Sequence, residues 1–183
     1  RVPVPQPKPG EVMVRTVATT ICTSDLNDIA HNPFGIALPR VMGHEGAGVV
    51  AALGEGVSQF RVGDRVAAHP VIPCRACENC QRGLGHLCSN LGHLGLDRDG
   101  TFAEFFCIRA DRARRIPPVV EFAAAALLEP VAVCLEAVQR GRIMNTNADF
   151  NAHSEVEPGG TGYQPVLSGH WPDKAVAGSS PLR

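Results

Sequence analysis

The chain has 183 residues, of which 44% are hydrophobic and 19% are charged, and its formal net charge is −1. These proportions are ordinary for a globular protein, and the length suits one domain of usual size with part of another. A nucleic-acid partner would require a basic surplus, which is absent from the composition. No apolar run approaches the ~20 residues of a membrane span. Seven cysteines at metal-type spacing, without a visible secretory signal, predict a cytoplasmic protein.

The first candidate site follows the first predicted strand. Residues 1–10 are rich in proline and therefore extended, and residues 11–20 alternate valines with polar residues, which predicts a half-buried strand. Cys22 comes next, with Ser24 and Asp25 close behind it. A lone thiol is more often a core residue than a ligand. A hydroxyl and a carboxylate within three residues nevertheless suggest a metal ligand, a proton carrier and an orienting group.

A second candidate pair, His44 and Glu45, is flanked by glycines that allow close approach to a metal. Imidazole and carboxylate are both ligands of catalytic zinc. Residues 46–51 also fit the dinucleotide fingerprint G-x-G-x-x-A. That fingerprint requires a strand before it and a helix after it, and here the valines continue as strand, so we reject this interpretation. Residues 57–68 resemble a further hairpin with its turn at 63–64, and short strands with frequent turns predict a small barrel or sandwich.

Residues 71–90 carry the most specific pattern, C-x2-C-x2-C-x7-C, at Cys74, Cys77, Cys80 and Cys88. Thiolates at every third residue can face one centre, and the longer loop returns the fourth, which predicts a closed structural zinc site. Disulfides would suit a small secreted chain. The iron–sulfur pattern C-x2-C-x2-C-x3-C-P differs in its last gap and in the residue after it. Both stay as alternatives.

The remaining stretch to residue 142 predicts a strand at 101–107 and a helix-prone segment at 122–139, divided by Pro130. By itself, the sequence gives Glu129, just before this proline, as a helix-end carboxylate. We expect the other cysteines and several histidines to be buried thiols and packing or surface residues: Cys107, Cys134, His69, His86 and His93.

Five motifs, in matching order and spacing, give the chain a family resemblance. It resembles the zinc-containing medium-chain dehydrogenase/reductase family, which includes alcohol, sorbitol and threonine dehydrogenases. The motifs are Cys22-Thr23-Ser24-Asp25, Gly43-His44-Glu45, Val62-Gly63-Asp64-Arg65-Val66, the four-cysteine stretch and Gly100-Thr101-Phe102-Ala103-Glu104. The resemblance covers about residues 1–142. It implies a mainly β fold, a GroES-like β-barrel with a structural zinc lobe at 1–121, followed by a short helical connection at 122–142.

The resemblance also implies roles for the candidate residues. Cys22 and His44 would hold a catalytic zinc, with Glu45 or Glu129 as a third or exchangeable ligand. Ser24 would take the alcohol proton, and Asp25 would orient His44. The zinc would favour an alkoxide that transfers hydride to NAD(P). The four clustered cysteines would hold a second, structural zinc.

Two positions depart from the threonine-type pattern. Thr23 replaces a glycine, and Asn27 replaces a histidine that passes the proton on. An uncharged amide cannot accept and release a proton, which counts against a threonine-specific enzyme.

Residues 143–183 contain none of the family's strand, G-x-G-x-x-G and helix, so we expect a disordered tail outside the family, and a missing Rossmann domain. We therefore expect the catalytic-domain fragment of a zinc- and NAD(P)-dependent alcohol or polyol dehydrogenase, inactive alone, with a small alcohol or polyol as substrate. The alternative is a zinc-binding structural or interaction module without catalysis. Oligomeric state is left open.

Overall fold

A computed structural model describes residues 2–141 of the chain. The expected tail at 143–183 lies outside the described residues. The fold is mainly β, as the sequence predicts. The elements are β1 (Glu11–Thr20), α1 (Thr23–His31), β2 (Glu45–Leu53), β3 (Arg65–Ala68), β4 (Val71–Ile72), α2 (Glu78–Gln81), η1 (Gly85–Leu87), β5 (Gly92–His93), β6 (Phe105–Arg109), η2 (Ala110–Arg112), β7 (Ala113–Arg115), α3 (Phe122–Ala126) and α4 (Leu128–Arg140).

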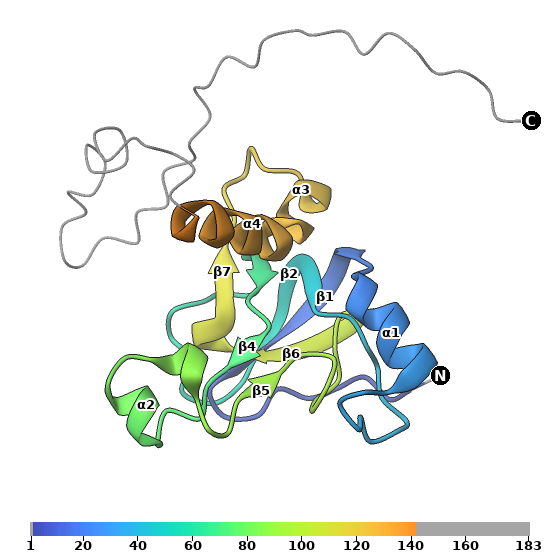
Figure 1. Ribbon diagram of the computed structural model, residues 1–183. Coiled ribbons are helices and arrows are strands. Elements are labelled where there is room, and N and C mark those ends of the chain that lie inside the picture. Colours follow the sequence, from blue (N-terminus) through green and yellow to red (C-terminus); the bar gives the residue numbers. More distant parts are fainter. Residues whose placement is uncertain (1, 142–183) are drawn as a thin grey trace, which may run out of the picture. The chain divides into compact units, whose positions relative to one another are not determined.

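The main sheet has five strands in the order β6-β1-β2-β3-β7 (Figure 1), and every printed pairing between them is antiparallel. The predicted alternation along β1 is confirmed for Val12 and Val14, which are fully buried, but Val17 is exposed. The two buried valines join Val50, Phe106 and Ile108 in the main core cluster. Burial of such side chains gives about 1.5–3 kcal/mol each, so this sheet forms the stable frame on which the candidate sites are placed.

The β1–β2 pairing fixes the region of the first candidate site. Thr20, the last residue of β1, lies directly opposite Glu45, the first residue of β2. Gly48 allows this close pairing, since a Cβ there would lie 2.0 Å from the carbonyl oxygen of Arg15. The hairpin predicted at 57–68 is only partly right. Only Arg65–Ala68 is strand, and it pairs with β2, because the chain turns at Gly63 (φ +96°).

The four clustered cysteines lie in a separate segment, residues 73–91, which we call the cysteine lobe. It extends from the two-stranded sheet of β4 and β5 (Figure 1). Its two short helices, α2 and η1, contain no buried residue. The cysteine lobe therefore has no hydrophobic core in these helices to hold it folded.

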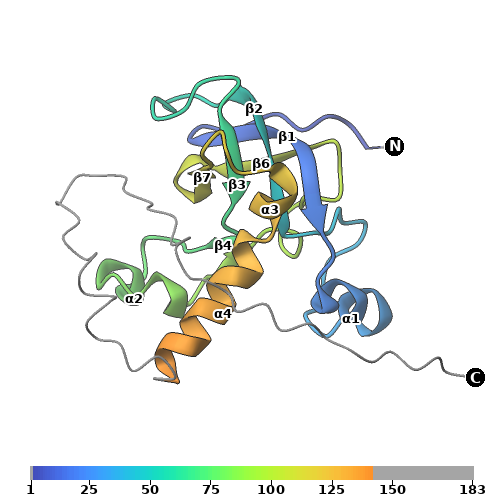
Figure 2. The same ribbon diagram turned by 90° about the horizontal axis from the view of Figure 1, so that it is seen from above.

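The helical segment at 122–139 is confirmed, but its predicted division at Pro130 is wrong. The break lies at Leu127, between α3 and α4. Pro130 sits in the first turn of α4, where a missing N–H costs little because no carbonyl partner precedes it. Helix α3 packs on the sheet through Ala125 and Ala126, and α4 continues from it (Figure 2). Helix α4 has no buried residue and exposes Val131 and Leu135. Among the described residues, no helix combines the length and apolarity of a membrane span.

Candidate metal centres

The sulfur atoms of Cys74, Cys77, Cys80 and Cys88 lie within 4.8 Å of one another. The Sγ atoms of Cys74 and Cys80 are 4.0 Å apart, and those of Cys77 and Cys88 are 3.9 Å apart. Four thiolates at the usual zinc–sulfur distance of about 2.3 Å would be about 3.8 Å apart at the corners of a tetrahedron. The sulfur geometry thus fits a four-coordinate zinc. A disulfide requires about 2.05 Å, and all seven cysteines of the chain are free.

Backbone N–H groups hold these sulfurs in place. The amides of Ala76 and Cys77 donate to Cys74 Sγ, each at 3.4 Å, and the amide of Cys74 donates to Cys88 Sγ at 3.2 Å. Backbone N–H groups of Cys80 and Ser89 lower the pKa of Cys77 to about 6. Burial among the other sulfurs raises the pKa of Cys80 to about 12. The amides of Ala76 and Cys77 also lower the pKa of Cys74. The cluster thus favours thiolates at Cys74 and Cys77 and opposes a thiolate at Cys80, unless a cation balances the charge.

The second set of ligands is assembled from two strands that are distant in sequence. Cys22 lies two residues after Thr20, which pairs with Glu45, and His44 immediately precedes Glu45. A thiol, an imidazole nitrogen and a carboxylate oxygen of these residues consequently lie within 4.8 Å of one another. Three protein ligands of these types are typical of a zinc site that keeps one position open for a substrate.

Asp25 and Thr20 orient two members of this second set. Asp25 is 2% exposed; its Oδ2 accepts a hydrogen bond from the Cys22 amide at 2.9 Å, and its Oδ1 lies 3.5 Å from His44 Nδ1. A carboxylate facing Nδ1 favours the proton on that nitrogen, which leaves Nε2 as the ligand atom. Nε2 is also the nitrogen that lies 3.9 Å from Glu45 Oε1. The Thr20 hydroxyl donates to the other oxygen of Glu45.

Glu129 lies beside the same set, at the start of α4. Burial raises its pKa; His44 opposes this shift, whereas the charge of Glu45 and a hydrogen bond with Glu45 add to it. Two carboxylates and an imidazole side by side would share a cation readily. Glu129 therefore lies near His44 and Glu45 but outside the set of ligand atoms within 4.8 Å of one another, and its role as a ligand stays a prediction.

Ser24 and Asn27 lie on α1 with different exposure. Ser24 is half-buried in the first helical turn, two residues beyond Cys22, whereas Asn27 is exposed. The role of Ser24 as a proton carrier stays a prediction.

His93 is a neighbour of the site that the sequence did not reveal. Its ring packs edge-on against that of His44, with centroids 5.3 Å apart and an interplanar angle of 66°. Burial lowers the pKa of His93, and its Nδ1 lies 2.8 Å from the carbonyl oxygen of Leu94, so Nδ1 carries the proton and donates it there. His93 therefore presents a neutral ring beside the second set of ligands. No motif signals this contact, because it depends on where β5 meets the main sheet.

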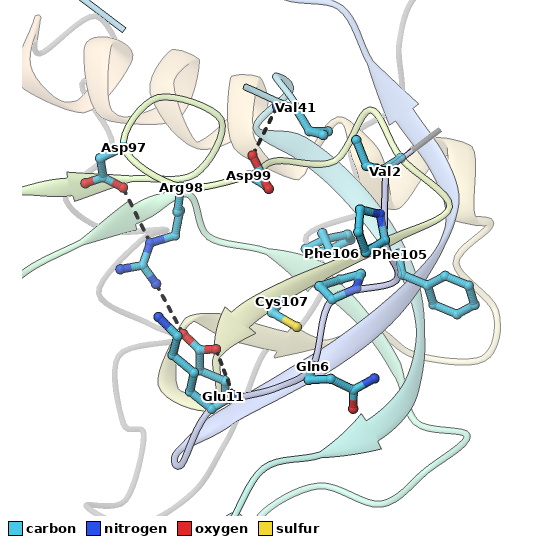
Figure 3. Close-up of a pocket in the computed structure, with 14 residues that line it drawn as sticks. Val2, Gln6, Glu11, Val41, Asp97, Arg98, Asp99, Phe105, Phe106 and Cys107 are labelled. Atoms are coloured by element: carbon cyan, nitrogen blue, oxygen red, sulfur yellow. Dashed lines mark hydrogen bonds and ion pairs between the residues drawn. The ribbon is translucent and has the colours of Figure 1, made fainter. Parts of the chain in front are cut away.

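A pocket of about 380 Å³ lies elsewhere, beneath the extended N-terminal segment (Figure 3). It is lined by residues such as Val2, Glu11, Arg98, Phe106 and Cys107, and it includes none of the candidate metal ligands. Burial raises the pKa of Cys107 to about 11, which keeps this thiol protonated and unreactive near neutral pH. Cys107 is only partly buried and Cys134 is exposed on α4, so the prediction of two buried thiols is wrong for Cys134.

Comparison with known proteins places the chain in a family. The profile of the alcohol dehydrogenase GroES-like domain matches residues 8–118, more than half of the chain. The chain belongs to this family. It is 39% identical over 145 residues to the L-threonine 3-dehydrogenase of Pyrococcus abyssi, covering 78% of this chain and 42% of that protein. It is 40% identical over 142 residues to the D-altritol 5-dehydrogenase of Agrobacterium fabrum, covering 77% and 42%.

A solved structure agrees with the assignment to the GroES-like family. It is a protein from Sinorhizobium meliloti 1021, described as a zinc-binding dehydrogenase and bound to NADP; it shares 35% identity with this chain and superposes with a TM-score of 0.72. The match covers 76% of this chain and 40% of that one. The chain thus spans about two fifths of the length of the relatives it matches.

Proposed function

We propose that this GroES-like domain is the zinc-binding catalytic part of an NAD(P)-dependent dehydrogenase that oxidises a small alcohol or polyol. The observation that carries the proposal is the convergence of Cys22, His44 and Glu45 within 4.8 Å. A purely structural zinc protein would need only the cysteine lobe. Two relatives support the substrate class, since one is a threonine dehydrogenase and the other an altritol dehydrogenase, and both compounds carry a secondary hydroxyl.

In this proposal, Cys22 and His44 hold the catalytic zinc, and Glu45 or Glu129 is a third or exchangeable ligand of the zinc. Zinc supplies a Lewis acid that lowers the pKa of a hydroxyl group. Asp25 keeps the His44 proton on Nδ1 and so keeps Nε2 free. Ser24, in the first turn of α1, accepts the substrate proton. Cys74, Cys77, Cys80 and Cys88 hold a structural zinc.

We propose that the nicotinamide and much of the substrate are bound by the part of the relatives that this chain does not match. We therefore expect the 183-residue chain by itself to show negligible turnover with NAD(P) and secondary alcohols. Steady oxidation of sorbitol or threonine by the pure chain would contradict this expectation.

The zinc content of the purified chain tests the proposal. Elemental analysis should give two zinc ions per chain, and the Cys22→Ser variant should give one. The matched control, Cys107→Ser, should keep both, because this thiol lines neither metal cluster. A single zinc in the unmodified chain, unchanged by Cys22→Ser, would instead favour a zinc-binding module without catalysis. Titration with NAD(H) in parallel tests cofactor binding by the chain.

A further inference from the structure

The cysteine lobe has few contacts that could hold it in place before a metal binds. Its helices have no buried residue, and its base is the two-residue pairing of Val71–Ile72 with Gly92–His93. Such short strands hold little by themselves. Any further contact between the lobe and the five-stranded sheet therefore matters for the metal site.

One such contact is made by Arg109, the last residue of β6, and Asp111, which lies in η2 directly after that strand. The guanidinium of Arg109 donates from Nε to Asp111 Oδ1 at 2.9 Å and from Nη2 to Asp111 Oδ2 at 3.0 Å. Its remaining nitrogen, Nη1, donates to the carbonyl oxygen of Pro73 at 2.6 Å. Asp111 Oδ2 also pairs with the Arg75 guanidinium. We call this set the Arg109–Asp111 clamp.

The Arg109–Asp111 clamp thus binds the residues on either side of Cys74. The backbone that carries the clamp is well anchored, because Ile108 and Ala110 are buried and the Ala110 amide donates to Gly10 O at 2.9 Å. Both Arg109 and Asp111 are about three quarters buried, with side-chain exposures of 21% and 26%. A bidentate arginine–carboxylate pair with this burial is held more firmly than an exposed single-contact pair.

The backbone of Arg75 explains why the turn after Cys74 needs these contacts. It adopts φ +65°, the left-handed conformation that is unfavourable for a non-glycine residue. This conformation lets the next two amides, those of Ala76 and Cys77, turn back to Cys74 Sγ at 3.4 Å. The guanidiniums of Arg109 and Arg75 hold the pKa of Asp111 below its usual value, although burial alone would raise it. The carboxylate is therefore charged near neutral pH and available to both arginines.

We propose that Arg109 and Asp111 are positioning residues for the metal of the cysteine lobe: by fixing Pro73 and Arg75, they preorganise the turn from Cys74 to Cys77 and slow the release of the ion. This inference rests on the proposed zinc site of the lobe. It predicts a kinetic role for Arg109, which is not a metal ligand and lies 36 residues away in sequence from Pro73, the residue before Cys74.

The test measures zinc release into excess chromophoric chelator from variants made in a Cys22→Ser background, so that the lobe holds the zinc that is followed. Asp111→Ala and Arg109→Ala should each release zinc about 10-fold faster, the lower end of what loss of an outer partner costs a metal site. The double variant should be little faster than either single variant, because both changes remove one clamp. Arg109→Lys should not restore slow release, since lysine cannot bind Pro73 O and both Asp111 oxygens together.

The matched control is Asp64→Ala. Asp64 pairs with Arg115 at 2.7 Å and accepts the Arg61 amide on the barrel, and its side chain is 21% exposed. This control should release lobe zinc at the unmodified rate, and circular dichroism should show the same fold in all variants.

An unmodified release rate in folded Asp111→Ala would overturn the clamp, as would equal acceleration by Asp64→Ala. If Asp111→Ala does not fold, Asp111→Asn, which keeps the size of the side chain, decides by the same rate criterion. Absence of zinc from the Cys22→Ser parent would refute the proposed lobe site, and the positioning role of Arg109 and Asp111 with it.

Discussion

The two sets of candidate ligands are built in opposite ways. The four lobe cysteines lie within fifteen residues of sequence, in a segment whose two short helices contain no buried residue. Cys22, His44 and Glu45 come from the ends of two long strands, and His44 and Glu45 are 7% and 5% exposed. We therefore expect the first site to need a metal to become ordered, and the second to be ordered by the barrel. Loss of the metal should therefore unfold the first locally and leave the second almost unchanged.

The strongest way to test this contrast is Cys80→Ser. Structural zinc contributes about 10–16 kcal/mol in small zinc domains, which is about 3 kcal/mol for each of four ligands. The affinity of the lobe for zinc should fall about 100-fold or more, and residues 73–91 should become sensitive to protease. Limited proteolysis with zinc analysis checks both effects. Full resistance to protease would show that the lobe is held by something other than metal.

The second site should instead be sensitive to changes in the barrel. In Gly46→Ala, the new Cβ would lie 2.5 Å from Cγ2 of Thr101, which is fully buried. Overpacking of this kind costs about 1–3 kcal/mol, which should appear as a lower urea midpoint together with loss of one zinc.

Gly85→Ala is the control for this change. In the lobe, its Cβ would meet only the Pro73 ring, at 3.3 Å. Its urea midpoint should stay close to that of the unmodified chain. A larger loss from Gly85→Ala than from Gly46→Ala would reverse the contrast.

A smaller effect is expected from Asp25→Asn. The amide can still accept from the Cys22 backbone but no longer presents a charge to His44 Nδ1, so zinc affinity of the second site should fall about 10-fold. Calorimetric titration of the metal-free protein would resolve this change from binding at the lobe. Equal affinity would mean that the barrel alone fixes the His44 ring.

The smallest effect concerns pH. The pKa of Glu129 is raised in the folded metal-free protein, so this carboxyl binds more protons folded than unfolded. Its contribution to stability is present below its unfolded pKa of about 4.3 and is lost as pH rises through the raised folded pKa. Metal-free Glu129→Gln should therefore lose less stability than the unmodified chain between about pH 4 and pH 7. Urea unfolding at both pH values measures this, and parallel curves would show that Glu129 is not buried against Glu45.

The two sites also differ in how well the sequence predicts them, because one has ligands that are close in sequence and the other does not. The spacing of the lobe cysteines contains nearly all of their geometry, because every ligand is local. The second site needed the β1–β2 register, which the sequence suggests only through the order of motifs around Cys22 and His44. No sequence motif predicts the His93 contact or the Arg109–Asp111 clamp, since each contact joins segments that approach only in the folded chain. The break at Leu127 was missed because the sequence does not show that Pro130 falls in a first helical turn.

The lack of buried residues in the helices of the cysteine lobe also affects how the domain should respond to cooling. The heat-capacity change of unfolding comes mainly from apolar surface, which the barrel buries and α2 and η1 do not. Hydrophobic stabilisation weakens as temperature falls, so the barrel should lose part of its stability in the cold while a zinc-loaded lobe, held by metal–sulfur bonds, loses little. Cooling would then lower the stability of the barrel more than the stability of the zinc-loaded lobe.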